Sequence, residues 1–130
     1  MPSQPLAFFE VTGLPKEAEK SIDLFHIYKD LRHELHSAQI FPIGEEPNGK
    51  SFTGFQFLMP DGEGYLLVFR ELHEHESINM PTLFPASETL QFTKVYGNGA
   101  DFTATVDQEG KLPFTISQKN DFCLYKYSVK

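Results

Sequence analysis

The chain has 130 residues, of which 40% are hydrophobic and 22% charged, and its formal net charge is -7. A chain of this length can bury roughly two thirds of its unfolded surface in one core. The acidic balance, with no basic cluster, argues against nucleic acid and anionic membranes as partners. The 13 phenylalanines and the absence of tryptophan are typical of strands packed face to face.

An apolar segment and then a helix are predicted at the start of the chain. Residues 6–11 form a short run typical of a buried strand. Pro15 suits the first turn of a helix, and apolar residues then recur every three to four positions from Ile22 to Ala38. We therefore predict one long helix over residues 15–38, whose broad apolar stripe needs a large partner surface.

The next segment, Phe41 to Lys50, is rich in proline and glycine and is predicted to be a loop or linker. After it the hydrophobic period changes from about 3.6 residues to 2. The turn Asp61-Gly62 predicts a hairpin, because Asp-Gly supplies the positive φ that tight turns need. The predicted strands are residues 51–59, 64–71, 88–97, 101–107, 112–117 and 122–129.

These elements predict a mainly β protein. We expect an antiparallel β-sandwich of about seven or eight strands preceded by one long α-helix. The predicted domains are residues 1–50 (a strand-like segment, the helix and a linker) and residues 51–130 (the sandwich). Alternation places Phe52 on the face opposite to Phe55 and Phe57. The predicted core consists of Phe55, Phe57, Leu66, Val68, Phe92, Phe102, Val106, Phe114 and Tyr125.

Five histidines are the candidates for a metal site. His73 and His75 flank Glu74, and two rings at this spacing on a strand can bind zinc. The other three, His26, His33 and His36, lie on the predicted helix. No His-x-x-x-His motif with an intervening glutamate occurs, and no cysteine supports a site. A polar loop and a solvated helix face are therefore the preferred interpretation. We predict no metal ion and no cofactor.

Catalytic groups are equally sparse. Cys123 is the only cysteine, which excludes an intrachain disulfide, and its place inside a predicted strand indicates a small buried hydrophobe. Glycosidase chemistry needs two carboxylates around the scissile bond, and the acidic clusters Glu45-Glu46 and Glu71, Glu74, Glu76 are better explained as solvated loop charges. We predict no catalytic residue in the chain. Arg70 could pair with Glu71 or Glu17, or tie the sheet to a neighbour.

The sequence predicts neither an export signal nor a membrane span. No apolar run approaches the ~20 residues of a membrane span, and no basic stretch followed by an apolar one opens the chain. Together with the single cysteine, this favours a cytoplasmic location and predicts no membrane partner.

Three segments between residues 35 and 71 have distinctive wording: Leu35-His-Ser-Ala-Gln-Ile-Phe-Pro-Ile-Gly44, Pro47-Asn-Gly-Lys-Ser-Phe-Thr-Gly-Phe-Gln56 and Gly64-Tyr-Leu-Leu-Val-Phe-Arg-Glu71. Together they resemble the C-terminal region of melibiase-type α-galactosidases and related glycoside hydrolases. In that clan a catalytic (β/α)8 barrel is followed by an antiparallel sandwich. The resemblance implies that the helix is the last barrel helix and that the chain is either a fragment of a glycoside hydrolase or a stand-alone relative of its sandwich. The family's catalytic aspartates lie on earlier barrel strands, so none is carried over.

The resemblance implies a non-catalytic sandwich domain that stabilises a catalytic barrel, which would be its partner. Two alternatives stay open. A carbohydrate-binding module would present aromatic side chains in a row on one sheet face, with Phe52, Phe55, Phe57, Tyr65 and Phe69 as candidates. An interaction domain would form a homo-oligomer through the apolar stripe of the helix.

Overall fold

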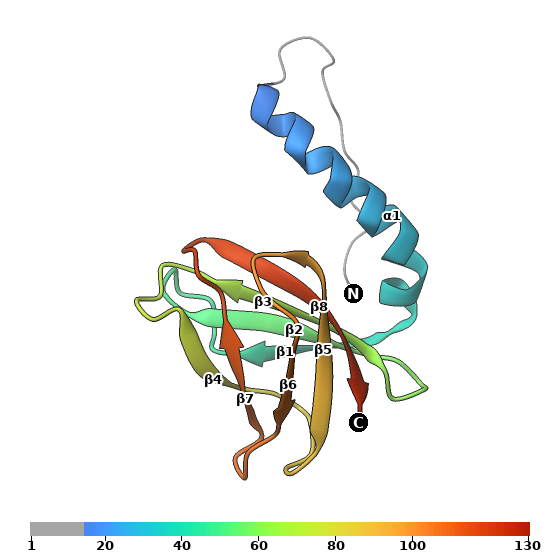
Figure 1. The fold of residues 1–130 in the computed structure, drawn as a ribbon, viewed down its shortest axis with the longest axis vertical. Coiled ribbons are helices and arrows are strands. Elements are labelled where there is room, and N and C mark those ends of the chain that lie inside the picture. Colours follow the sequence, from blue (N-terminus) through green and yellow to red (C-terminus); the bar gives the residue numbers. More distant parts are fainter. Residues whose placement is uncertain (1–14) are drawn as a thin grey trace. The chain divides into compact units, whose positions relative to one another are not determined.

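The computed structural model describes residues 15–130, and the chain divides into two units after Ser37. The described part of the first unit is helical: a 3-10 helix η1 (Lys16–Ser21) leads into α1 (Ile22–Ser37). Figure 1 labels α1 and the strands of the second unit. The strand predicted at residues 6–11 lies outside the described residues.

The helix ends where its sequence predicts, but its start differs: residues 16–21 form a 3-10 helix and the α-helix begins only at Ile22. Pro15 occupies the N-cap of η1 with an extended ψ of 148°, and Glu17 follows in the first turn, where the helix dipole favours a carboxylate. At the other end, the Ser37 hydroxyl donates to the carbonyl of Glu34 at 2.8 Å. The predicted end near residues 37–39 is therefore confirmed. None of the helices in residues 15–130 combines the length and apolarity that crossing a membrane requires.

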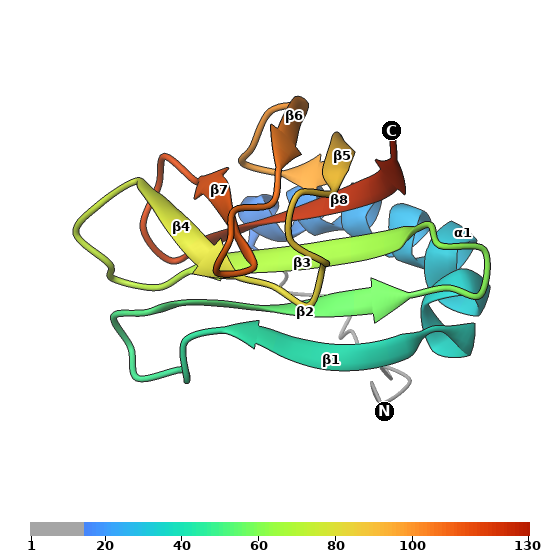
Figure 2. The same cartoon turned by 90° about the horizontal axis from the view of Figure 1, so that it is seen from below.

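The second unit is an antiparallel β-sandwich, so the predicted fold class is confirmed. Its larger sheet has the strand order β1-β2-β3-β8-β5-β6, and β4 and β7 form a second sheet. Figure 2 shows β1, β2 and β3 side by side, and in Figure 1 the strands β4 to β7 run across them. The strands are β1 (Gln39–Gly44), β2 (Phe52–Leu58), β3 (Gly64–Arg70), β4 (Ser77–Pro81), β5 (Thr89–Gly97), β6 (Phe102–Thr105), β7 (Lys111–Thr115) and β8 (Asp121–Val129).

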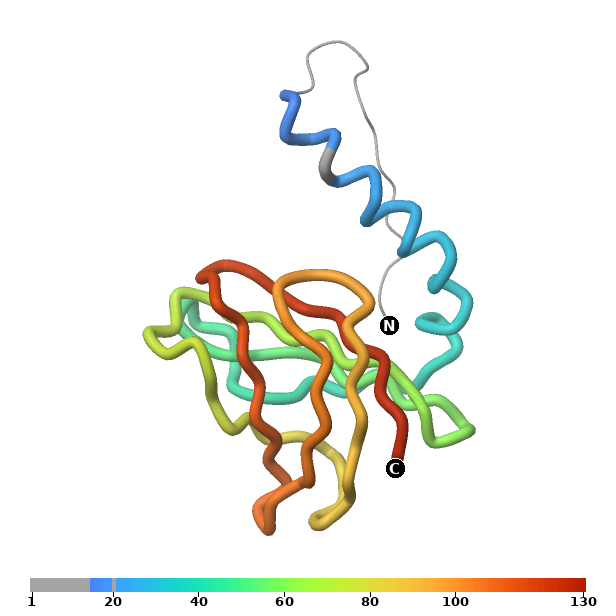
Figure 3. The backbone as a smooth tube through the Cα atoms, viewed as in Figure 1, coloured from blue at the N-terminus to red at the C-terminus, as the bar shows by residue number. Residues whose placement is uncertain are grey.

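The β2–β3 hairpin forms where the Asp-Gly turn predicts it. Gly62 has a φ of 83°, and its N–H donates to the carbonyl of Met59 at 3.1 Å. The tube in Figure 3 shows this green turn at one end of the two strands. Because the turn fixes the register, Phe57 lies opposite Tyr65 and Gln56 lies opposite Leu66.

The core between the sheets is an aromatic cluster. The Phe92 ring stacks on Phe102 with centroids 4.6 Å apart, and Phe84 meets Tyr127 edge to face at 4.8 Å. Such pairs add roughly 0.5–1.5 kcal/mol each to the burial of their area. Most of the predicted core is confirmed, with Leu66, Val68, Phe92, Phe102, Val106, Phe114 and Tyr125 in or against this cluster.

One predicted core residue, Phe55, is wrong because it is 42% exposed, whereas Phe57 is buried as predicted but lies outside the main cluster. Phe55 and Phe57 point to the opposite face of β2, whereas Phe52 is fully buried in the core. The register explains this, because Phe57 pairs with Tyr65 while the core residue Leu66 pairs with Gln56. Successive side chains of a strand point to opposite faces, so Phe55 and Phe57 share the outer face with Tyr65.

Two strands were also missed. Residues 41–44, predicted as part of a loop, belong to β1, which pairs with β2 over its whole length. Pro42 is tolerated there because β1 is an edge strand and needs no donor on its free side. The second is β4, which pairs with β7 and buries Met80 completely.

Candidate functional site

The outer face of the large sheet is the most distinctive surface of the β unit. One row across the sheet contains Phe55, Leu67, Leu124 and Tyr96, and the next contains Thr53, Phe69 and Phe122. A sheet with one solvated face normally alternates apolar and polar side chains, but here both faces are apolar. We call this surface the outer aromatic face and define it as Phe55, Phe57, Tyr65, Leu67, Phe69, Tyr96, Phe122 and Leu124.

The side chains of the outer aromatic face differ in exposure. Phe57 and Tyr65 are only 6% and 2% exposed, while Phe55 is 42% exposed. Phe69 and Phe122 are half-buried, with ring centroids 5.9 Å apart. The accessible part of the face is therefore a patch of aromatic edges and not an isolated side chain.

An open depression adjoins this patch where β5 bulges. Its volume is about 540 Å³, and it is lined by residues 94–98 together with Asp121 and Phe122. The register against β8 shifts between Lys94 and Tyr96, which bends the strand. Gly97 has a φ of 104°, and a Cβ atom there would lie 2.3 Å from the carbonyl oxygen of Phe122. Glycine at this position therefore keeps the bulge closely packed on β8.

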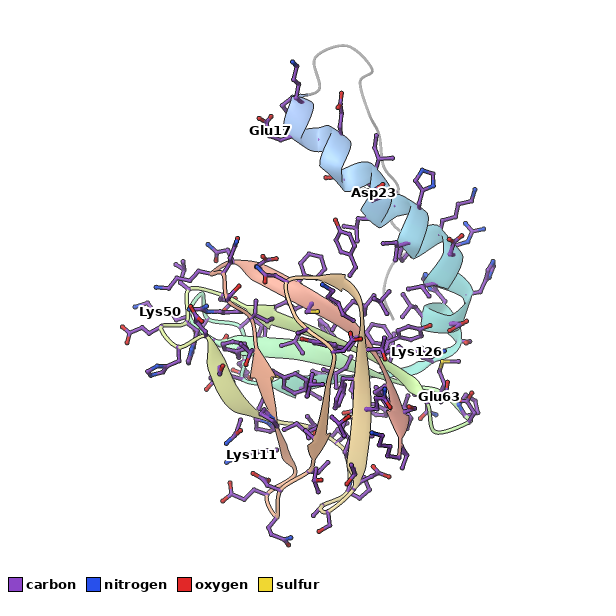
Figure 4. The ribbon with its side chains drawn as sticks, in the orientation of Figure 1. Glu17, Asp23, Lys50, Glu63, Lys111 and Lys126 are labelled. Carbon is purple, nitrogen blue, oxygen red and sulfur yellow. The ribbon has the colours of Figure 1, made fainter. Side chains whose placement is uncertain are left out.

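Charge is confined to the rim of the outer aromatic face. Lys126 Nζ lies 3.5 Å from a carboxylate oxygen of Glu63 and 5.9 Å from the centre of the Tyr65 ring, and Figure 4 shows Lys126 and Glu63 close together. Polar groups become more frequent towards β6, where Thr103 is exposed. This arrangement offers apolar contact area with few hydrogen-bonding groups, and it holds no pairing of a nucleophile with a base.

The candidate metal ligands do not form a site. The backbone N–H of His75 donates to Nδ1 of His73 at 3.2 Å, and the His73 ring packs on Phe52 with centroids 5.2 Å apart. On the helix, His36 Nε2 is hydrogen-bonded to the Tyr28 hydroxyl at 2.9 Å, and His33 is exposed. Residues 15–130 contain no group of three or more His, Cys, Asp or Glu side chains that could hold a metal ion.

Glu71 has a structural role. One of its carboxylate oxygens accepts the Ser51 hydroxyl at 2.7 Å and the backbone N–H groups of Ser51, Gly49 and Asn48 at 3.0, 2.7 and 3.2 Å. These hydrogen bonds, with the Ser51 hydroxyl first, hold the pKa of Glu71 below its ordinary value. The carboxylate thereby anchors the loop that leads into β2.

Arg70 does not pair with Glu71. Its guanidinium, on a residue only 3% exposed, donates five hydrogen bonds to backbone carbonyls, including Ile116 and Ser117 at 2.8 Å and His73 at 2.9 Å. The planar fork of five N–H donors is what lets one side chain satisfy so many carbonyls. Arg70 therefore ties the end of β3 to the segments that lead into β4 and follow β7.

Cys123 lies in the core with no exposed area. Burial raises the pKa of its thiol, which disfavours the reactive thiolate. The interpretation of Cys123 as a small buried hydrophobe is therefore supported by its position.

Sequence reasoning missed the contributions of Tyr96, Phe122 and Leu124 to the outer aromatic face. The signal that could have revealed them lies in β3, where residues 65–69 are all apolar. A continuous apolar run is typical of a strand buried on both faces. The strands that pair with such a strand are then expected to carry apolar residues on both of their faces as well.

Comparison with family models, with curated proteins and with solved structures gave no match for this chain. The resemblance to α-galactosidases therefore stays a prediction carried by residues 35–71.

Proposed function

We propose that the β unit is a non-catalytic accessory domain that docks onto a neighbouring protein unit through its outer aromatic face. The resemblance makes the catalytic (β/α)8 barrel of an α-galactosidase-like glycoside hydrolase the candidate neighbour. The observation that carries the proposal is a sheet with apolar side chains on both faces. Such a sheet gains stability when a second apolar surface covers it, because roughly 25 cal/mol is gained per Å² of apolar area removed from water.

The composition of the face favours a protein partner over a sugar. Aromatic rings can stack on a sugar, but the hydroxyls also need hydrogen-bonding groups. The two central rows contain only Thr53 and the Tyr96 hydroxyl as polar groups. The remaining side chains of these rows are apolar, and they suit contact with an apolar protein surface better than contact with a sugar. Titration with galacto-oligosaccharides tests the alternative, and a saturable heat signal would favour a carbohydrate-binding module.

The docking experiment measures binding of the full chain to an isolated α-galactosidase barrel by calorimetry and sedimentation velocity. Phe55→Asp places a charge in the exposed patch and should weaken binding by at least about tenfold, because a buried unpaired charge is costly. Thr103→Asp is the matched control, since it adds the same charge on the same side of the sheet at its polar end. It should leave the affinity within about twofold.

Three results would contradict the proposal. If the chain hydrolyses an aryl α-galactoside by itself, the domain is not non-catalytic. If it does not bind the barrel but self-associates in a manner that Phe55→Asp abolishes, the partner is a second copy and not a barrel. If Phe55→Asp and Thr103→Asp weaken binding equally, the effect is one of net charge and the outer aromatic face is not the interface.

A further inference from the structure

A second surface lies at the open end of the sandwich and is separate from the outer aromatic face. It is a hollow of about 250 Å³ between the ends of β1, β2 and β8 and the segment that joins β4 to β5. Four of the eight large apolar side chains that are exposed in the described part of the chain gather around it: Phe41, Leu58, Leu83 and Val129, at 37%, 39%, 57% and 52% exposure. Scattered exposed hydrophobics need no explanation, but a cluster around a concave surface does.

Hydrogen bonds beneath the hollow fix the residues that line it. Gln56 is 2% exposed, and its Oε1 accepts the backbone N–H of Leu83 at 3.0 Å. The same side-chain amide is hydrogen-bonded to the Tyr127 hydroxyl, which donates to the carbonyl of Phe57 at 3.0 Å. The segment carrying Leu83 is thus fixed to the large sheet, so a ligand would not have to order it.

One charged group, Glu88, lines the hollow. Its backbone is fixed, because its carbonyl accepts the N–H of Val106 at 2.9 Å. Its side chain is half-buried, and within residues 15–130 its carboxylate takes part in no hydrogen bond or ion pair. No lysine, arginine or histidine lines the hollow. The site therefore combines an apolar wall with an unpaired negative charge, on a chain whose net charge is already -7.

We propose that this hollow binds a small organic cation, with an aromatic or branched aliphatic body in the apolar slot and an ammonium group at Glu88. The size fits, because a cavity of about 150 Å³ holds one benzene molecule, and 250 Å³ leaves room for a short chain. An anion of the same shape would meet the Glu88 carboxylate without a compensating cation. A neutral polar ligand would find few partners, since Oε1 of Gln56 is already engaged.

The test uses amide NMR spectra of the full chain titrated with three probes of matched shape: 2-phenylethylammonium, 2-phenylethanol and phenylacetate. We expect saturable shifts at the amides of Leu83, Glu88 and Val129, with a dissociation constant roughly in the millimolar range for the cation. The cation should bind about tenfold more tightly than the alcohol, because a hydrogen bond to a charged group is the stronger kind. Added salt should weaken the binding of the cation and leave the binding of the alcohol unchanged.

Two variants and a control locate the site. Glu88→Gln should remove the preference for the cation over the alcohol, while the alcohol still binds. Leu83→Ala should weaken the binding of the cation and of the alcohol by the same factor. Glu46→Gln removes the same charge from an exposed loop and should change nothing, which controls for the overall field of the protein. The proposal is overturned if no probe shifts these amides, if phenylacetate binds as well as the cation, or if Glu88→Gln leaves the preference intact.

Discussion

Truncating two phenylalanines of the same strand tests the assignment of its faces. Phe52 and Phe55 both lie on β2, but Phe52 has no exposed area and Phe55 is 42% exposed on the opposite face. Phe52→Ala removes a ring from the closed core, where it also packs edge to face on His73. Phe55→Ala removes the same atoms from a surface that water already reaches.

The structure sets the size of both effects. Replacing a fully buried phenylalanine by alanine costs about 3–5 kcal/mol, since the lost transfer energy is joined by the energy of the cavity. At Phe55 slightly more than half of the side chain is buried and no closed cavity forms. Only part of the roughly 1.5–3 kcal/mol for full burial is then lost, or about 1–2 kcal/mol. The gap of about 2 kcal/mol corresponds to a difference in Tm of roughly 8–16 °C.

Urea unfolding followed by circular dichroism measures both variants, because the chain has no tryptophan to report on folding. Equal slopes of free energy against urea would show that the unfolded states are comparable. The assignment is refuted if Phe55→Ala destabilises the chain as much as Phe52→Ala. It is also refuted if Phe52→Ala costs less than about 1 kcal/mol, which would mean that the core does not close around this ring.

Two further predictions concern side chains that anchor loops. Glu71→Gln should lower the free energy of unfolding at neutral pH and should lower it much less at about pH 3. The pKa of Glu71 is lowered in the folded state, so its carboxylate stabilises the fold above the ordinary pKa, and this stabilisation is lost as the pH falls. An equal loss of stability at both pH values would contradict this prediction. Arg70→Met should destabilise by about 2–4 kcal/mol, since it leaves the carbonyls of Ile116 and Ser117 without their donor. Arg70→Lys should lose less stability, because lysine keeps three hydrogen-bond donors. If urea unfolding gives Arg70→Met the same stability as the parent chain, water replaces the guanidinium and the prediction is wrong.

Local signals predicted most of the fold. The Asp61-Gly62 turn, the change of period after residue 50 and the strand at residues 122–129 were each predicted from a few neighbouring residues, and each is confirmed. The failures have a different origin. Pro42 and Gly44 favour a loop locally, and only pairing with β2 makes this segment an edge strand. Tertiary contacts of this kind are not encoded in a short window of sequence.

The candidate surfaces were harder to predict than the fold because they depend on register. β2 and β3 are apolar on both faces, so alternation alone cannot say whether Phe52 or Phe55 faces the core. The pairing of Gln56 with Leu66 decides it. The hollow at the end of the sandwich combines residues of three strands and of the segment between β4 and β5, which are distant in sequence. Glu88 taken alone is one more acidic surface residue.

Strand β2 therefore contributes to the core and to both proposed binding surfaces. On β2, Phe52 faces the core, Phe55 faces outward, and Gln56 lies beneath the end hollow. A slip of one residue would exchange the inward and outward sets and destroy all three at once. β2 resists such a slip because it is paired on both sides, with β1 and with β3, and because Gly62 fixes the turn at its end. The hairpin predicted from Asp-Gly is thus the element on which both proposed binding surfaces depend.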